Sequence, residues 1–399
     1  MAELRPGVVL LSRQEAPATG AGAPVISAWS AISPWGLTAA DFAAGLRSGR
    51  RTATRLDPAE WAVPVPDACL VPGFDVRTEL GRKGTRSMDR ASGLAGAADG
   101  RLLGSGAGGG ERLPGLAADA GLVLGTTTGS AQSMMDFTRE SLVSTRPYLV
   151  DPARFPSTVM NCAAGQAAIW HRLEGPNATV AAGRATGLTT LQYALRLHRA
   201  GRAGALLCGA VEEFSTARAW LAWHARDGES GADGPVPLLG EGATVWLLES
   251  AEVARAHGRA VLAEPVGLEF GFARDRAAVR PVLARCLRRL LDRAGSAGSA
   301  AADVALVADS QQAGADGAAE RAALADVLGA VGTAGPRRVG CADRIGDTAS
   351  ASAAFQVAAV LACAAEPAAD AGRLALVTAA EAGGVVAAAA LRLPEGGRS

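Results

Sequence analysis

Short apolar runs recur along the chain and alternate with stretches that have the spacing of helices. An apolar run of about four to eight residues between turn residues is typical of a strand buried on both faces of a sheet. Runs of this kind begin at Gly121, Gly204, Glu241, Asp303, Leu374 and Val385. They predict that both halves of the chain contribute buried strands.

Helices are predicted between these strands. Residues 38–49 have the pattern of a helix that begins at a capping threonine and ends at a glycine. Residues 178–201 are predicted to form a strand, a sharp turn and a long helix, and two further helices are predicted over 318–330 and 351–366. Strands that alternate with helices in this way favour an α/β fold.

Length and hydrophobicity allow a large core. The chain has 399 residues, 49% of them hydrophobic, which suits several domains or one large duplicated domain. The alternation of strands and helices in the first half of the chain repeats weakly in the second half. We therefore expect a loose Ala/Gly/Pro-rich leader over 1–22, followed by two similar halves, 23–250 and 251–399.

Charge and cysteine content exclude several classes of partner and site. The 39 basic and 39 acidic residues balance, so no nucleic acid and no anionic membrane is expected as a partner. The six cysteines form no CxxC pair and no zinc-type spacing with histidine, so neither a metal nor a cofactor is expected. The apolar residues 8–11 are too few for a signal sequence or a spanning helix, which predicts a cytoplasmic protein.

Four segments in a fixed order carry a family resemblance. Residues 155–187 open with P-S-T-V-x-N and continue through A-A-G-Q and G-P-N. MDRAS begins at Met88, LGEGA at Leu239 and AGGVVAAAALRL at Ala382. Together they resemble the β-ketoacyl synthase family from about residue 24 to the end. The resemblance implies a thiolase-like, five-layered αβαβα fold with two pseudo-repeated halves, normally dimeric.

The catalytic residues of that family are replaced in this chain. The chemistry needs a cysteine thiolate at a helix N-terminus and two histidines. The resemblance puts Arg184 at the cysteine position, and a guanidinium has no lone pair with which to attack a thioester. Ser310 and Asp347 stand at the histidine positions and Ala342 at that of a lysine, while the gating loop reads AEAGG over 380–384. The resemblance therefore implies a degenerate site.

An arginine at a buried helix N-terminus is opposed by the helix dipole and by desolvation. It needs an acidic partner, and the family fold brings positions 184 and 347 together. We expect Arg184 to pair with Asp347, so that the ion pair fills the position of the family's catalytic pocket. The alternative is an arginine that reaches solvent through an open channel. No base is visible beside Ser310, and Cys162 and Cys208 are expected to be buried structural thiols.

A ketosynthase-like chain without its triad resembles the chain length factor of type II polyketide synthases. That resemblance implies a heterodimer with an active ketosynthase, whose acyl tunnel the inactive chain completes. An acyl carrier protein with its phosphopantetheine-bound chain would be the second partner. The tunnel and interface positions fall on Ala131, Met134, Met135 and Thr138, near Phe137. Small or pliable side chains there leave open a long or reduced, polyene-like product.

Other interpretations stay open. The segment around Met134 also fits an ordinary helix whose apolar residues lie in the core. The chain also fits a repurposed enzyme, dehydratase-like or cyclase-like, that acts on carrier-bound substrates through Asp347, Ser310 or Glu381. A third interpretation is a scaffold that only docks a carrier protein, for which the Arg-rich helix beginning at Ala284 offers a positive face.

Overall fold

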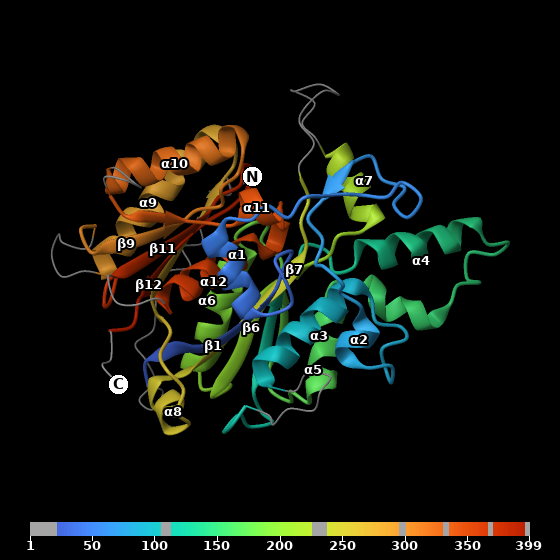
Figure 1. Cartoon of the computed structure of the whole chain (residues 1–399), viewed down its shortest axis with the longest axis horizontal. Coiled ribbons are helices and arrows are strands. Elements are labelled where there is room, and N and C mark those ends of the chain that lie inside the picture. Colours follow the sequence, from blue (N-terminus) through green and yellow to red (C-terminus); the bar gives the residue numbers. More distant parts are fainter. Residues whose placement is uncertain are drawn as a thin grey trace, which may run out of the picture.

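Two five-stranded mixed sheets form the centre of the molecule (Figure 1). The structure is a computed structural model that describes residues 22–104, 113–225, 238–294, 301–329, 335–365 and 370–395. The leader predicted over 1–22 lies outside the described residues, apart from Gly22. The strands of one sheet lie between Pro24 and Ser250, and those of the other between Glu264 and Arg392.

The first sheet has the strand order β1-β7-β6-β4-β5. Strands β6, β4 and β5 are parallel, and β7 runs antiparallel to both β6 and β1. Every residue of β4 and β7 is buried, as their continuous apolar sequences predict. The bounds are β1 Pro24–Ile32, β4 Gly121–Gly125, β5 Asn177–Val180, β6 Ala205–Glu212 and β7 Gly242–Ser250.

The second sheet has the strand order β10-β9-β11-β12-β8. Strands β10, β9 and β11 are parallel, and β12 is antiparallel to β11 and β8. Strand β8 was not among the predicted strands, because its buried and half-exposed positions do not alternate regularly. The bounds are β8 Glu264–Ala273, β9 Val304–Ala308, β10 Arg337–Val339, β11 Leu374–Ala379 and β12 Gly384–Arg392.

Helices form three layers around the two sheets (Figure 1). Helices α6 and α12 lie between the sheets and share one apolar core with both of them. Helices α3 and α5 cover the outer face of the first sheet, and α9 and α10 cover that of the second. This is the predicted thiolase-like αβαβα arrangement. The bounds are α3 Arg90–Leu103, α5 Cys162–His171, α6 Thr186–Arg199, α9 Arg276–Ala294, α10 Gly314–Leu328 and α12 Ser352–Ala364.

The two central helices approach each other closely because small residues face the contact. A side chain at Gly187 in α6 would overlap the backbone of Ala354 in α12. Helix α12 is buried over almost its whole length, which its Ala-rich sequence permits without a bulky layer between the sheets. The contact places the N-terminus of α6 beside the segment that leads into α12.

Helix α4 (Ala131–Val143) and the 3₁₀ helix η1 (Pro152–Thr158) extend to one side of this body (Figure 1). Nine of the fourteen large hydrophobic side chains that are exposed among the described residues fall between positions 135 and 169. We call these nine the α4–α5 face. They are Met135, Leu142, Val143, Tyr148, Leu149, Phe155, Val159, Met160 and Ile169.

Shorter elements connect the layers. Helix α1 begins after a capping box at Thr38 and ends at Gly49, whose φ is +64°, as the sequence predicts. Across the described ranges no helix is both long enough and apolar enough to cross a membrane. The remaining bounds are α1 Ala39–Ser48, α2 Val76–Leu80, α7 Thr216–His224, α8 Ala251–Ala256, α11 Ala342–Ile345, η3 Ala349–Ala351, β2 Thr54–Arg55 and β3 Asp67–Ala68.

Candidate functional site

A tight turn places Arg184 immediately before α6. The amide of Ala185 donates to the carbonyl of Ala182 at 3.2 Å, and the hydroxyl of Thr186 accepts from the Ala182 amide at 2.8 Å. Gly183 has a φ of +54°, and a side chain there would overlap the carboxylate of Glu381. Glycine therefore allows both the turn and the approach of Glu381.

Backbone hydrogen bonds to the segment before β7 fix the position of Asp347. Its amide donates to the carbonyl of Leu238 at 2.7 Å, and its carbonyl accepts from the amide of Gly240 at 2.9 Å. The Arg218 guanidinium also donates to the Asp347 carbonyl, at 2.8 Å. These bonds aim the carboxylate at the N-terminus of α6.

Arg184 and Asp347 form the predicted ion pair. Arg184 Nη1 lies 3.0 Å from Asp347 Oδ1, and Nη2 donates to Oδ2. The pair is bidentate, and the two side chains are only 19% and 24% exposed. Burial alone would raise the pKa of Asp347, but the Arg184 guanidinium, with the Arg218 charge and the Ala349 backbone amide, outweighs burial and holds that pKa below its ordinary value. An acyl thioester would have to displace two charged side chains to reach this turn.

Glu381 closes the same turn from the other side. Its Oε2 accepts a hydrogen bond from the backbone amide of Arg184 at 3.3 Å. Backbone amides at the start of a helix are where an anion is stabilised by the helix dipole. The carboxylate therefore occupies a donor that would be needed to stabilise a substrate oxyanion.

Ser310 does not join this ion pair, and the expectation that no base lies beside it is wrong. Its hydroxyl donates to Oε2 of Glu320 in α10, and its amide donates to Oε1 at 3.2 Å. Thr378 also donates to Oε1, at 2.7 Å, and Gln312 donates to the Ser310 hydroxyl at 3.2 Å. Glu320 comes ten residues after Ser310, so only the packing of α10 reveals the contact.

This serine is nevertheless not set up as a nucleophile. Ser310 and Glu320 are each about 1% exposed. Burial, and then the nearby charge of Asp309, raise the pKa of Glu320 to about 7. A carboxyl group with a pKa near 7 would suit a general base at neutral pH, but both groups are enclosed, so no substrate can reach the hydroxyl without a rearrangement.

We expect Glu320 to make the fold less stable as pH rises from about 4.5 to about 7. The folded chain keeps a proton that the unfolded chain releases near the ordinary pKa of 4.5, so the folded state binds more protons in this window. The loss is about 3 kcal/mol at most, at 1.36 kcal/mol per pKa unit. Melting temperatures at about pH 5 and about pH 8 measure it, and Glu320→Gln should reduce the difference.

Two other buried carboxyl groups should also make the fold less stable as pH rises. Burial raises the pKa of Asp99 to about 8, and burial with the Asp89 charge raises that of Glu213 to about 7. Glu320→Gln should therefore reduce the pH dependence without abolishing it. An unchanged pH dependence in this variant would show that Glu320 is ionised in the folded chain.

Neither Cys208 nor Cys162 offers a substitute nucleophile. Cys208 is fully buried in β6, and burial raises its pKa. Burial, and then the Asp89 charge, also raise the pKa of Cys162, whose sulfur accepts from Gln166 at 3.1 Å. Cys208 is therefore the expected buried thiol, whereas Cys162 is only partly buried, and the raised pKa favours the protonated form of both. In the described part of the chain no three His, Cys, Asp or Glu side chains gather as a metal site would require.

The four predicted tunnel positions lie on one face of α4. Ala131, Met134, Met135 and Thr138 follow the spacing of residues that share a helix face. Ala131 is buried, Met134 is half-buried, and Met135 and Thr138 are exposed. The stripe therefore runs from the buried start of α4 to exposed positions further along the helix.

No pattern in the sequence predicts the hydrogen-bonded network that anchors α4. Glu213 follows β6. Its Oε1 accepts hydrogen bonds from the Ser130 hydroxyl at 3.2 Å and from the backbone amide of Gln132 at 3.3 Å. Arg218 donates to the Glu213 carbonyl at 2.8 Å and to the Asp347 carbonyl. One arginine thus links the start of α4 to Asp347.

Comparison with known sequences agrees with the motifs. The sequence model of the family described as "Beta-ketoacyl synthase, N-terminal domain" matches residues 24–254. The chain is 30% identical over 229 residues to 3-oxoacyl-[acyl-carrier-protein] synthase 2 of Vibrio cholerae, a match that covers 52% of each protein. The Synechocystis protein of the same name is 30% identical over 273 residues, or 61% of each. The chain spans about half the length of the first of these relatives.

Solved structures extend the similarity along the chain. A structure described as the ishigamide ketosynthase/chain length factor is 42% identical, with a TM-score of 0.83, and the match covers 94% of this chain and 100% of that one. A β-ketoacyl synthase from Burkholderia phymatum is 21% identical, with a TM-score of 0.74, and the match covers 93% of this chain and 99% of that one. At that identity the second structure is evidence for the fold alone.

Proposed function

Because this chain belongs to the β-ketoacyl synthase family, we propose that it is the non-catalytic, chain-length-factor subunit of a type II polyketide synthase. It would pair with an active ketosynthase and shape the acyl tunnel of that partner. The Arg184–Asp347 pair carries the proposal: a guanidinium held by a carboxylate stands where condensation needs a thiolate. The similarity to a ketosynthase/chain length factor over 94% of the chain supports the same role.

The α4–α5 face supports a protein partner. Its nine large apolar side chains come from α4, η1, α5 and their connections, and η1 packs on both helices. Ile169 and Leu142 are 81% and 79% exposed. Many large exposed apolar side chains on neighbouring elements of a single chain indicate a site of association. A second subunit would remove this surface from water.

An unpaired strand edge lies beside that face. Strand β5 pairs only with β4 among the described strands, so the backbone groups of its other edge have no sheet partner there. The Thr179 hydroxyl in β5 is enclosed, and in this part of the chain it has no hydrogen-bond partner. A strand edge of this kind is a template for pairing with another chain.

Co-expression tests the proposed role. The chain alone should not become acylated by an acyl carrier protein substrate, whereas the chain with an active ketosynthase should purify as a heterodimer that extends acyl chains. The same ketosynthase without this chain should lose activity or product fidelity. A stable homodimer that modifies a carrier-bound substrate by itself would instead support the repurposed enzyme.

Met134→Trp should shorten the product of the heterodimer. Met134 is the half-buried member of the α4 stripe, and an indole fills space that a flexible thioether leaves accessible. The expected result is loss of one or more extension cycles, measured by mass spectrometry of the released products. Ala131→Phe should act in the same direction, but Ala131 is buried, so its stability must be checked first.

Asp136→Trp is the matched control. Position 136 lies two residues beyond Met134, so its side chain leaves α4 about 200° further round the helix. The control should keep the original product length. If both tryptophan variants leave the product unchanged while the heterodimer still forms, α4 does not line the tunnel.

A further inference from the structure

Helix α4, which carries the predicted tunnel positions, makes little contact with the core (Figure 1). Ala131 is the only buried residue among its thirteen. Its middle packs on η1 through the rings of Phe137 and Phe155, whose centroids are 6.0 Å apart, and η1 itself buries only Ser157. Most helices are held by an apolar face, and a helix that lacks one depends for its direction on the polar bonds at its ends.

Glu213 supplies such bonds at the start of α4. The first backbone amides of a helix have no partner within the helix. The Glu213 carboxyl group accepts from the Gln132 amide and from the Ser130 hydroxyl. Ser130 in turn caps α4 by accepting from the Ser133 amide at 3.1 Å. Glu213 is thus a second cap of α4, and it comes from a distant part of the chain.

Glu213 is itself fixed to a rigid element. It directly follows β6, which is buried along almost its whole length, and its carbonyl accepts from Arg218 at 2.8 Å. The preceding residue, Glu212, accepts from the hydroxyl of Thr127 in the connection between β4 and α4, and from the Ser350 hydroxyl at 2.7 Å. Two consecutive carboxyl groups therefore hold this connection and the first turn of α4 at the end of β6.

The position of the first turn determines where the tunnel positions lie. Ala131 stands between the two residues that donate to Glu213, and Thr138 lies about 10 Å further along the helix axis, at about 1.5 Å per residue. A tilt of about 10° at Ala131 would move Thr138 by about 2 Å. That displacement exceeds the length of a carbon–carbon bond, about 1.5 Å, so it would change which acyl chain fits beside α4.

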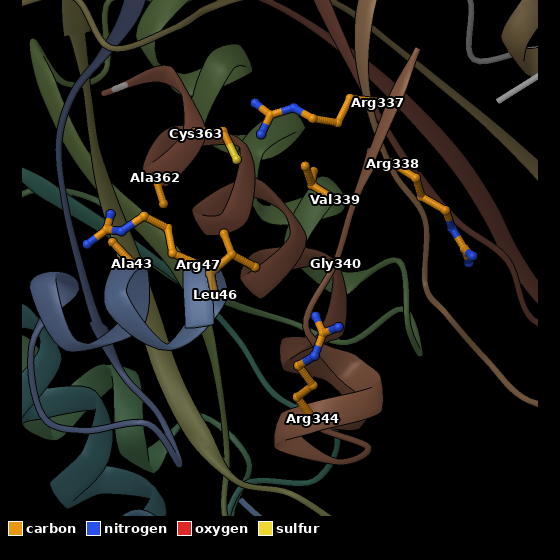
Figure 2. Close-up of a pocket in the computed structure, with 10 residues that line it drawn as sticks. All are labelled: Ala43, Leu46, Arg47, Arg337, Arg338, Val339, Gly340, Arg344, Ala362 and Cys363. Atoms are coloured by element: carbon orange, nitrogen blue, oxygen red, sulfur yellow. The ribbon is translucent and has the colours of Figure 1, made fainter. Parts of the chain in front are cut away.

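Glu213 can influence a substrate only through α4, because its side chain is about 1% exposed. A half-open pocket lies elsewhere, between α1, β10, α11 and the end of α12 (Figure 2). Its described lining residues include neither Glu213 nor any residue of α4, and the side chains of Arg337 and Arg344 lie at its opposite ends. That pocket therefore gives Glu213 no separate role.

We propose that Glu213 is a positioning residue that fixes α4 and thereby the length of the acyl chain that the heterodimer makes. The proposal rests on the proposed function, in which α4 lines the tunnel. A cap that only stabilised the fold would change the melting temperature and leave the product unchanged, so product length distinguishes the two roles.

Glu213→Ala should make the heterodimer release a broader mixture of chain lengths. The Ser130 hydroxyl and the Gln132 amide lose their acceptor, so the first turn of α4 is no longer held at the end of β6. We expect the share of the main product, measured by mass spectrometry, to fall about twofold or more, because a misplacement of about 1 Å can change a rate by far more than that. Glu213→Gln keeps an acceptor oxygen in a side chain of the same length, so it should keep the product distribution of the unmodified chain.

Two further variants separate this anchor from general loss of stability. Ser130→Ala removes the cap and one donor to Glu213, so it should broaden the products even if Glu213→Ala does not assemble. Glu320→Ala is the matched control, because it removes another buried, hydrogen-bonded carboxyl group that lies on α10 and not beside α4. It should lower the melting temperature and keep the product distribution.

Two measurements test whether Glu213 acts through α4. In the Met134→Trp chain, Glu213→Ala should restore part of the longer products, because the indole shortens them only while α4 holds it in place. Hydrogen exchange reports on the chain alone: Glu213→Ala should speed the exchange of the α4 amides, while Glu320→Ala should leave their rates unchanged.

The proposal is overturned if Glu213→Ala and Ser130→Ala both leave the product distribution unchanged in heterodimers that still extend acyl chains. It is also overturned if Glu320→Ala broadens the products as much as Glu213→Ala, or if the α4 amides exchange at the same rate in both variants. A failure of the proposed function looks different: the unmodified chain with an active ketosynthase would then extend no acyl chain, which overturns both proposals at once.

Discussion

Asp347→Ala is expected to lower the free energy of unfolding by about 3–5 kcal/mol, because it leaves a largely buried guanidinium without its partner. Arg184 is enclosed at the N-terminus of α6, where the helix dipole also opposes a positive charge. Burial alone would lower the pKa of Arg184, and the Asp347 carboxylate is the main cause of its rise above the ordinary value. Thermal and urea unfolding of the purified chain, or of its heterodimer, measure the loss.

The double variant Arg184→Met/Asp347→Leu distinguishes the loss of the ion pair from the burial of an unpaired charge. Replacing a buried ion pair by apolar residues of similar size is often neutral or stabilising, so this variant should recover most of the lost stability. Asp326→Ala, which breaks the surface pair with Arg280, should change stability very little. Equal stability of Asp347→Ala and the unmodified chain would mean that Arg184 reaches solvent, the alternative that the sequence left open.

Leu142→Glu combined with Ile169→Glu is expected to weaken association with the ketosynthase roughly 100-fold. Both side chains are about four-fifths exposed on the single chain, so the change should not disturb the fold of the chain itself. In a heterodimer that buries the α4–α5 face, each glutamate would be desolvated without a partner. A 100-fold change corresponds to about 2.7 kcal/mol, which is typical of hot-spot positions.

Phe272→Glu provides the matched control, since Phe272 is 63% exposed on β8, in the other sheet. Analytical ultracentrifugation of the co-expressed pair measures the dissociation constant of each variant. The double variant should dissociate and lose chain extension together, while Phe272→Glu keeps both. A heterodimer that resists both glutamates would place the interface elsewhere on the chain.

Local sequence was sufficient for the fold class and for the absence of a cysteine from the turn before α6. Strands buried on both faces appear as continuous apolar runs, so β4, β6 and β7 could be predicted without knowledge of their neighbours. Strand β8 could not be, because a half-exposed edge strand leaves no comparable run. The absence of a thiolate needs only the identity of the residue in the turn before α6, and Arg184 is that residue.

The contacts that surround Arg184 depend on the tertiary structure. Asp347 is 163 residues away in sequence and Glu381 is 197, and no periodicity reaches across such separations. The predicted pairing with Asp347 rested on the family fold, whereas the closure by Glu381 and the Ser310–Glu320 contact emerged only from packing. Glu320 faces Ser310 because α10 packs beside β9 and β11, where Thr378 completes the hydrogen bonds.

The sequence by itself determined that this chain has a β-ketoacyl-synthase-like order of strands and helices and no nucleophile in the expected turn, because both depend on residue type at neighbouring positions. Only the tertiary structure decided which charges meet, which apolar side chains stay exposed on the α4–α5 face, and that arginines from three elements surround one pocket. Those features depend on distances between segments far apart in the chain, which are fixed when the two sheets close on α6 and α12.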